Sequence, residues 1–283
     1  MTAAIAFQGV PGAYSDLACR AMAPSYTPLP CPTFEDAFAA VQEGLAERAL
    51  LPVENSTAGR VAAVHCVLPE AGLSIVGEHY QPVVHHLLAV PGAQLGTITQ
   101  ALSLDQGLAQ CRLWLREHHI HPVAYSDTAA AAAEVAQRGD PTVAAIASQR
   151  AGELYGLISL ASDIADVRPN TTRFLLLARE SVWPPVGSVP CITSLVFRVR
   201  SVPAALYKAL GGFATNGVNI TKIESYLVDE RFTAAQFHLD LEGHVDEEPV
   251  NRALEELRFF AHEVTVLGVY PAHPFRRNTG ATS

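Results

Sequence analysis

The sequence contains very little lysine and no concentration of positive charge. Its two lysines, Lys208 and Lys222, lie in the last third, whereas the first 190 residues contain ten arginines and no lysine. The formal net charge is −9, and no segment carries a basic stripe. Nucleic acid and anionic membrane surfaces are therefore excluded as main partners. The use of arginine without lysine could reflect the base composition of the genome. A functional explanation is that some of these arginines bind carboxylates in a bidentate manner, which lysine cannot do.

Other absences narrow the class of protein. No apolar run is long enough to span a membrane, and Met1 to Gly9 lacks the cationic region of a secretory signal, so we expect a soluble, cytoplasmic protein. The five cysteines form no Cys-x-x-Cys pair, which predicts free thiols in a reducing compartment. The clusters His85-His86 and His118-His119-x-His121 lack cysteine or carboxylate partners at ligand spacing, so we predict no metal site.

The first two thirds of the chain alternate short apolar strands with helices. This alternation predicts an α/β sheet with helices on both faces, and ligands at the carboxyl ends of its strands. Thr33 and Ser15 have the positions of helix caps. The strands are expected over Ala3–Phe7, Ala49–Val53, Val83–Val90 and Thr142–Ile146, and the helices over Ser15–Ala23, Phe34–Gly44, Leu104–Arg116 and Thr128–Arg138.

A second domain follows a linker at residues 181–191, in which Ser181–Pro190 contains three prolines and a glycine. The pattern beyond it predicts a small ferredoxin-like domain of order βαββαβ over residues 192–271, then a polar and loose tail, 272–283. Its strands are expected over Ile192–Arg200, Val218–Val228, Phe232–Leu241 and Glu263–Val269, its helices over Ala204–Asn216 and Glu247–Phe260, and a turn at Asp229-Glu230-Arg231.

Four segments carry side chains or glycines suited to binding. The turn Gln8–Ser15 has glycines that let a ligand approach, although a purely structural turn explains it as well. The loop Glu54–Gly59 follows a buried strand with polar side chains that can bind an oxygen-rich ligand, or form an Asx-turn and a cap. Asn170–Phe174 joins hydroxyls to an arginine at a strand edge, although an ordinary strand start explains it better. Ser103 and Gln110 lie near the start of a helix. Without a functional role, Ser103 would be a helix cap and Gln110 a solvent-exposed side chain.

Taken together, these segments resemble the monofunctional bacterial prephenate dehydratases over about Ile5 to Pro271. The resemblance rests on the glycine-rich opening, the Pro-x-Glu-Asn-Ser-x-x-Gly loop at 52–59, the Thr-Arg-Phe triplet at 172–174 and a following ACT regulatory domain. It implies a catalytic domain, residues 1–180, that is similar to a type II periplasmic binding protein. One lobe would contain residues 1–78 and 158–179, and the other residues 79–157.

The resemblance also implies site residues. Thr172 corresponds to the family's essential threonine, which would protonate the leaving hydroxyl of prephenate, and Arg173 would pair with a carboxylate or polarise Thr172. No cofactor is implied. The substrate-binding residues would be Asn55, Ser56, Glu54, Ser103, Gln110, Thr171 and Phe174. The chain departs from the family next to Ser103, where Leu104-Asp105 replaces His-Pro.

The ACT domain would bind the inhibitor L-phenylalanine between paired domains. The residues implied are Ala204, Ala205, Leu206, Asn219, Glu224 and Ser225. Two departures concern this site, since Ala204 replaces a glycine and Tyr226-Leu227 replaces Arg-Pro. Edge strands of the ACT sheet need covering, which predicts a homodimer or homotetramer.

Two alternatives stay open. Arogenate dehydratase shares the fold and the motifs, and an acidic cleft residue would favour arogenate because this substrate has an ammonium group where prephenate has a ketone. The other alternative is a non-catalytic amino-acid sensor, against which the absence of a DNA-binding helix-turn-helix argues.

Overall fold

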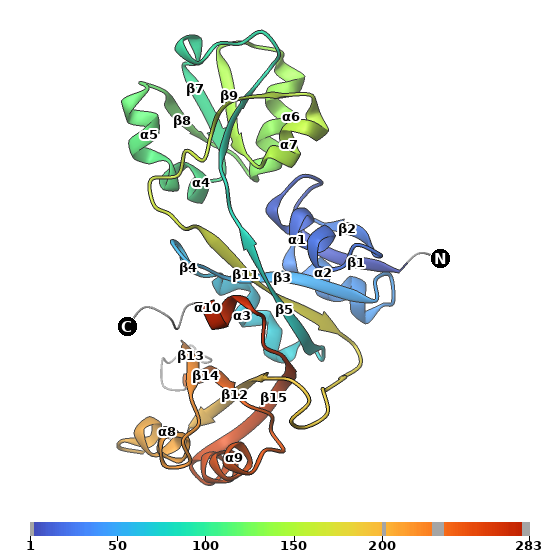
Figure 1. Cartoon of the computed structure of the whole chain (residues 1–283), viewed down its shortest axis with the longest axis vertical. Helices are drawn as coiled ribbons and strands as arrows, with labels where there is room; N and C mark the ends of the chain where they lie inside the picture. The colour runs from blue at the N-terminus through green and yellow to red at the C-terminus, as the bar shows by residue number, and fades with distance from the viewer. Residues whose placement is uncertain (1–2, 200–201, 228–234, 279–283) are drawn as a thin grey trace. The chain divides into compact units, whose positions relative to one another are not determined.

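The computed structural model describes residues 3–199, 202–227 and 235–278, which fold into two compact units (Figure 1). The first unit comprises Met1–Val64 and His79–Phe174, and the second comprises His65–Glu78 and Leu175–Ser283. The segment His65–Glu78, which we expected in a catalytic lobe, therefore groups with the C-terminal residues. Among the described residues, no helix is long and apolar enough to cross a membrane.

The first lobe is built on a sheet of strand order β2-β1-β3-β11-β5, with β4 paired to β3. β1 pairs in parallel with β2 and β3, as expected of an α/β sheet. Strands β5 and β11 each continue from one unit into the other. The elements are β1 (Ala4–Gln8), α1 (Tyr14–Met22), β2 (Thr27–Cys31), α2 (Phe34–Gln42), β3 (Arg48–Asn55), β4 (Gly59–Arg60), α3 (Ala62–Val67), η1 (Leu68–Glu70), β5 (Ser74–Pro82) and β11 (Thr171–Ala178).

The second lobe is a sheet of order β10-β6-β9-β7-β8. Neighbouring residues of its central strands enter different cores, Leu87 on one face and Leu88 on the other, so both faces are covered. This is why β9, and β6 after His86, are apolar in succession instead of alternating. The elements are β6 (His86–Ala89), η2 (Leu95–Thr97), β7 (Gln100–Ser103), α4 (Asp105–Gln110), α5 (Arg112–Glu117), β8 (His121–Ala124), α6 (Thr128–Arg138), β9 (Val143–Ala147), α7 (Gln149–Tyr155) and β10 (Ile158–Ser162).

Three local predictions differ from the structure. The helix expected over Leu104–Arg116 is interrupted at Cys111, whose backbone leaves helical geometry (φ −113°, ψ 17°). The strand expected over Val83–Val90 is shorter, because β6 begins only at His86. The first helix begins at Tyr14 rather than on a Ser15 cap, and the Asp16 carboxylate accepts from the Gly12 amide at 2.9 Å instead. The capping box at Thr33 is confirmed.

The second unit contains the predicted βαββαβ order, with the sheet order β13-β14-β12-β15. One face of this sheet packs against the two helices, in a core that includes Leu195, Leu239, Phe213 and Leu254. Its elements are β12 (Cys191–Val199), α8 (Ala205–Thr215), β13 (Ile220–Leu227), β14 (Ala235–Glu242), α9 (Glu248–Phe260), β15 (Ala261–Pro271) and α10 (Phe275–Asn278).

The other face of this sheet is covered by the segment His65–Glu78 of the same unit. Gly268 on β15 lies so close to β5 that an added Cβ would stand 2.0 Å from the carbonyl oxygen of Ile75. A side chain at position 268 is therefore incompatible with this packing, and glycine is needed there for close backbone approach rather than for a turn.

The C-terminal segment is more ordered than the expected loose tail. Residues 272–278 include the short helix α10, and Arg276 on it contacts Glu78 of β5. The predicted turn Asp229-Glu230-Arg231 lies outside the described residues.

Candidate active site

A cluster of hydrogen-bonded polar side chains lies in the first unit, at the ends of β3 and α4 and the start of β11. Asn55 Nδ2 donates to Thr172 Oγ1 at 3.0 Å and to Asn170 Oδ1 at 2.8 Å. Gln110 Nε2 donates to Thr57 Oγ1 at 2.7 Å and to Asn55 Oδ1 at 3.3 Å. The structure thus brings together Asn55, Gln110 and Thr172, the first and last of which are 117 residues apart in the sequence.

The local backbone explains why Asn55 can serve as the centre of this cluster. Asn55 ends the buried strand β3, and its Oδ1 accepts from the backbone amides of Thr57 and Ala58, each at 3.0 Å. This is an Asx-turn, in which the side chain takes the place of a backbone acceptor. The Asx-turn that we gave as the structural explanation of this loop is therefore present. It leaves the amide nitrogen of Asn55 available for other contacts.

The Asx-turn also fixes the direction of the hydrogen bond to Thr172. Backbone amides can only donate, so the atom of Asn55 that faces them must be the oxygen, and the atom that faces Thr172 must be the nitrogen. Thr172 Oγ1 is then an acceptor in this bond, and its own proton points elsewhere. Among the described residues, Asn55 is the hydrogen-bond partner of this hydroxyl. The Thr172 proton can consequently be given to a bound ligand.

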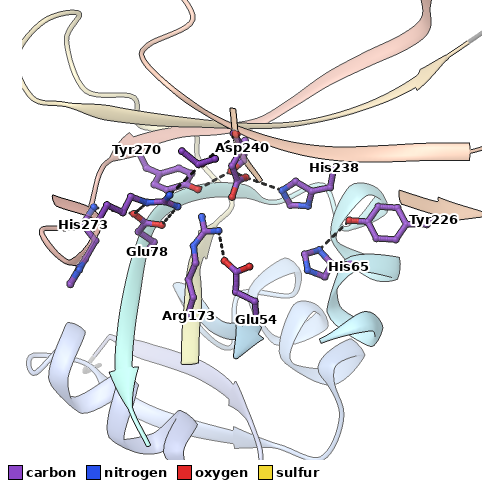
Figure 2. A network of polar contacts seen from close by, with 12 residues as sticks. Glu54, His65, Glu78, Arg173, Tyr226, His238, Asp240, Tyr270 and His273 are labelled. Atoms are coloured by element: carbon purple, nitrogen blue, oxygen red, sulfur yellow. Dashed lines mark hydrogen bonds and ion pairs between the residues drawn. The ribbon is translucent and has the colours of Figure 1, made fainter. Parts of the chain in front are cut away.

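Arg173 has a different neighbour from the ligand carboxylate that we expected. Successive side chains of a strand point to opposite faces, so Arg173 faces away from Thr172. Its Nη1 donates to Glu54 Oε1 at 2.8 Å, and its side chain is 3 % exposed (Figure 2). Glu54 directly precedes Asn55 on β3, so these two side chains also point to opposite faces. The sequence motifs therefore split into a face with Asn55 and Thr172 and a face with a Glu54–Arg173 ion pair.

Ser56, Thr171 and Phe174 hold the strand ends in place. The Ser56 amide donates to the Thr171 carbonyl at 2.9 Å, and the Thr171 amide donates to Ser56 Oγ at 3.0 Å. This reciprocal pair joins the loop after β3 to the start of β11. Phe174 is 1 % exposed and belongs to the packed interior.

Ser103 and the glycine-rich turn both serve the packing of the second lobe. Ser103 is fully buried at the end of β7, and its hydroxyl donates to the Ile146 carbonyl at 2.7 Å. Gly12 has φ +89°, its carbonyl accepts from Ser148 Oγ at 2.7 Å, and a Cβ on it would stand 3.1 Å from Ala151 Cα. The glycine of this turn is therefore required by backbone geometry and by close contact with α7.

The interruption at Cys111 gives Gln110 its position. Because α4 ends at Gln110, the Gln110 carbonyl is free to accept from the Asp166 amide at 2.7 Å. The Asp166 carboxylate in turn accepts from the amides of Leu113 (2.9 Å) and Trp114 (3.2 Å) at the start of α5. An open cavity of about 380 Å³ adjoins the Thr57–Gln110 pair. Its lining consists of Thr57, Ala58, Gln106, Ala109, Gln110, Arg112, Leu113, Asp166 and Val167.

Two residues of the cluster were not predicted. Asn170 lies two residues before Thr172 and thus on the same face of the strand. This spacing could have predicted from the sequence that Asn170 belongs to the cluster. His85 lies between β5 and β6 with its Nε2 atom 2.8 Å from Gln110 Oε1, and we had considered it only as a metal ligand. Among the described residues, no group of three histidines, cysteines or carboxylates is placed to hold a metal ion.

Burial of His85 makes stability dependent on pH. Burial lowers the pKa of its imidazole, although the hydrogen bond to Gln110 opposes this shift. The unfolded chain takes up a proton below about pH 6.5, whereas the folded chain does so only at a lower pH. We therefore expect the free energy of unfolding to fall as the pH drops from about 6.5 towards the lowered pKa. Urea denaturation at a series of pH values should show a shallower fall for His85→Gln; equal slopes would contradict this.

The residues predicted for an effector site lie in the second unit. Ala204 precedes α8 with φ 59° and ψ 23°, the left-handed region where glycine is favoured, so the glycine that the family resemblance implies here would fit this backbone. Leu206 packs against the core, and Asn219 Nδ2 donates to Glu242 Oε2 at 3.0 Å. Glu224 and Ser225 lie on β13, opposite His238 and Phe237 of β14.

A buried polar network covers the second face of this sheet (Figure 2). Ser194 Oγ donates to Asp240 Oδ1 at 2.5 Å, and His238 Nε2 lies 3.1 Å from the same oxygen. The Tyr226 hydroxyl lies 3.3 Å from His65 Nδ1, on α3. All of these side chains belong to the second unit, so β13 is joined by a polar contact to the segment His65–Glu78.

Comparison with known proteins identifies the family. The family model described as "Prephenate dehydratase" matches residues 5–182, well over half of the chain. The chain belongs to the prephenate dehydratase family. It is therefore an enzyme of the dehydratase, or lyase, type, and the expected fold of two α/β lobes followed by a βαββαβ unit is confirmed.

Relatives of this dehydratase carry several names. A "bifunctional N-acyl-homoserine lactone acylase/prephenate dehydratase" of Komagataeibacter europaeus is 50 % identical over 96 % of this chain and 97 % of its own length. "Arogenate dehydratase/prephenate dehydratase 1, chloroplastic" of Arabidopsis thaliana is 40 % identical over 94 % of this chain and 71 % of its own. The structure of prephenate dehydratase from Arthrobacter aurescens "in complex with L-Phe" has a TM-score of 0.87 and 31 % identity, covering 95 % of this chain and 90 % of that one.

Proposed function

We propose that this enzyme converts prephenate to phenylpyruvate, carbon dioxide and water, with Thr172 as the acid. The observation that carries the proposal is the Asn55–Thr172 hydrogen bond, whose direction leaves the threonine proton free in a chain of the prephenate dehydratase family. The reaction serves the biosynthesis of phenylalanine. The free cysteines support a reducing compartment, and we place the enzyme in the cytoplasm.

The reaction needs an acid and a firm hold on the substrate more than a strong driving force. The bond between the ring and its carboxylate breaks, its electron pair enters the ring as the ring becomes aromatic, and the ring hydroxyl leaves as water after taking one proton. Thr172 is a weak acid, so its proton would move late, when cleavage of the carbon–oxygen bond has built negative charge on the leaving oxygen.

Asn55 is positioned to stabilise the charge that remains on Thr172. As the threonine gives up its proton, its Oγ1 becomes negative, and the Asn55 Nδ2 donor already lies 3.0 Å from it. Preorganised donors of this type are effective because they need no rearrangement during the reaction. The threonine would recover its proton from solvent after product release. Arg173, held by Glu54, supports the start of β11 rather than the substrate.

An absorbance assay for phenylpyruvate tests the proposal. Purified enzyme given prephenate should release phenylpyruvate without added metal or organic cofactor. The same enzyme given arogenate should release phenylalanine slowly or not at all. Absence of phenylpyruvate under conditions in which the protein is folded would refute the assignment.

Arogenate is the second candidate substrate, since relatives about 40 % identical are named arogenate dehydratases. The cavity beside Gln110 contains both an acid, Asp166, and a cation, Arg112. Asp166 and Arg112 are both exposed, but both carboxylate oxygens of Asp166 already accept backbone amides. The exposed cation disfavours the ammonium group of arogenate, and we therefore place prephenate first.

We propose that L-phenylalanine inhibits the enzyme through the second unit. The structural relative from Arthrobacter aurescens was solved with L-Phe, and the predicted effector residues lie at the start of α8 and along β13. Such an ACT unit would act within a homodimer or homotetramer. Millimolar phenylalanine should lower turnover, and a flat dose response would show that the effector site has been lost.

An acylase activity can be tested under the same assay conditions. The Komagataeibacter relative is 50 % identical, and its name includes an N-acyl-homoserine lactone acylase. Incubation with such a lactone, followed by detection of free homoserine lactone, tests whether this chain shares that activity. Thr172→Val should leave any acylase activity intact if the two reactions use different sites.

A further inference from the structure

His85 is a buried side chain that the proposed reaction does not use directly. It is 2 % exposed and lies between β5 and β6. Its two ring nitrogens have defined neighbours: Nδ1 lies 3.1 Å from the Tyr14 hydroxyl, and Nε2 lies 2.8 Å from Gln110 Oε1. A histidine held on both sides in this way has a single orientation.

The directions of all hydrogen bonds between His85 and Thr172 follow from the Asx-turn. Asn55 Oδ1 is an acceptor, so the atom of Gln110 that faces it must be the donor Nε2. The other atom, Gln110 Oε1, then accepts from Asn170 Nδ2 at 3.1 Å and must also accept from His85. His85 is therefore protonated on Nε2.

The other side of the ring is compatible with this tautomer. Nδ1 of a neutral, Nε2-protonated imidazole is an acceptor, and the Tyr14 hydroxyl that faces it is a donor. The single proton of this hydroxyl is shared between Nδ1 and the Val84 carbonyl, which lies 2.7 Å from the tyrosine oxygen, so the assignment of the tautomer rests on the Gln110 side of the ring. Burial lowers the pKa of His85, which keeps the ring neutral at ordinary pH.

We propose that His85 is a positioning residue, which acts through Gln110 and Asn55 to hold the Thr172 hydroxyl in its proton-donating orientation. This inference rests on the proposed function, because it concerns the rate of the same reaction. If the Gln110 amide turned over, its nitrogen would face two donors and its oxygen would face Asn55 Oδ1. His85 and Asn170 together prevent this.

The chain of amides also strengthens the bond to Thr172. Each amide that accepts at its oxygen becomes a better donor at its nitrogen, and hydrogen bonds in series reinforce one another. Gln110 Oε1 accepts from His85 and Asn170, and Asn55 Oδ1 accepts from Gln110 and from two backbone amides. The last donor in the series, Asn55 Nδ2, is the one that faces the charge developing on Thr172.

Steady-state kinetics on His85 variants test this role. His85→Leu should lower kcat about tenfold, the equivalent of one hydrogen bond of about 1.4 kcal/mol, with KM nearly unchanged. His85→Gln should recover most of the rate, because its amide nitrogen can donate where Nε2 does. The neighbouring His86→Gln is the matched control: His86 bonds Ser159, and kcat should stay within about twofold of wild type.

A double-mutant cycle shows whether His85 acts through Gln110. The double variant His85→Leu/Gln110→Leu should be no slower than Gln110→Leu alone, whereas additive losses would overturn the relay. Nitrogen-15 chemical shifts of labelled imidazoles give a readout that does not depend on rate. They should show the neutral Nε2-protonated tautomer for His85, and an Nδ1-protonated or charged ring near neutral pH would overturn the proposal.

The outcomes separate this inference from the proposed function. Unchanged kcat in His85→Leu, or a loss confined to KM, overturns the positioning role while prephenate turnover stands. Wild-type protein that turns over neither prephenate nor arogenate overturns the proposed function instead, and the nitrogen shifts then decide whether His85 holds Gln110. If His85→Leu does not fold, Tyr14→Phe replaces it, because it removes the hydroxyl that orients the ring and should lower kcat in the same way.

Discussion

Thr172→Val should lower prephenate turnover by about 10²–10⁴-fold, the usual contribution of a positioned general acid. Valine has the shape of threonine without the hydroxyl, so the strand start and its packing stay intact while the proton donor is lost. Substrate affinity should change little, because Asn55 and the other polar groups of the cluster remain. Thr172→Ser should restore part of the rate, since it returns a hydroxyl to the same position. The phenylpyruvate assay measures each case.

Thr171→Val is the matched control for this experiment. Thr171 precedes Thr172 on β11, and its contacts with the loop after β3 use backbone atoms and Ser56 Oγ. Its side chain points to the opposite face of the strand, so turnover should stay close to that of wild type. Turnover of Thr172→Val within a few-fold of wild type, or an equal loss in both variants, would remove Thr172 from the mechanism.

Arg276→Gln should lower the free energy of unfolding by about 3–5 kcal/mol, the usual cost of leaving a buried charge without its partner. Arg276 Nε and Nη2 bond the two oxygens of Glu78 at 2.6 and 2.8 Å, and the Glu78 side chain is 0 % exposed. The His273 amide gives the same carboxylate a further donor at 3.0 Å. Glutamine cannot supply the planar fork of donors that the carboxylate accepts.

Urea denaturation followed by tryptophan fluorescence measures this effect. Trp183 lies against His244 of the second unit (ring centroids 6.0 Å apart), so its signal reports on that unit. Arg277→Gln is the matched control, because Arg277 is the exposed neighbour on the same short helix. Similar midpoints for the two variants would show that the Glu78–Arg276 pair contributes little.

The sequence predicted the order of elements and the members of the site better than their geometry. Periodicity and caps predicted the alternation of strands and helices and the βαββαβ unit, because those features are local, whereas the division into two lobes came from the family resemblance. The motif residues Asn55, Gln110 and Thr172 came from a family resemblance, since by themselves each had a bland interpretation. Their assembly depends on contacts between strands far apart in the chain, which no local pattern encodes.

The differences have identifiable physical causes. The interruption at Cys111 is fixed by Asp166, more than fifty residues away, which supplies a donor to α4 and acceptors to α5. The strand β2 contains two prolines, a composition that argues against a strand except at an edge, where β2 lies. The partner of Arg173 could have been inferred from alternation. Glu54 directly precedes Asn55 and Arg173 directly follows Thr172, so both side chains point away from the face of the Asn55–Thr172 bond.

The grouping of His65–Glu78 with the C-terminal residues bears on any truncation made to test the phenylalanine inhibition proposed above. A cut in the linker 181–191 would remove the sheet that this segment covers and the arginine that neutralises Glu78. The shortened enzyme would keep the charged Glu78 carboxylate without its arginine, and helix α3 without the sheet that covers it. Newly exposed surfaces of this kind promote aggregation. If phenylalanine inhibits as proposed, release from inhibition is better sought by single substitutions on β13 than by deletion, because the second unit is also part of the scaffold.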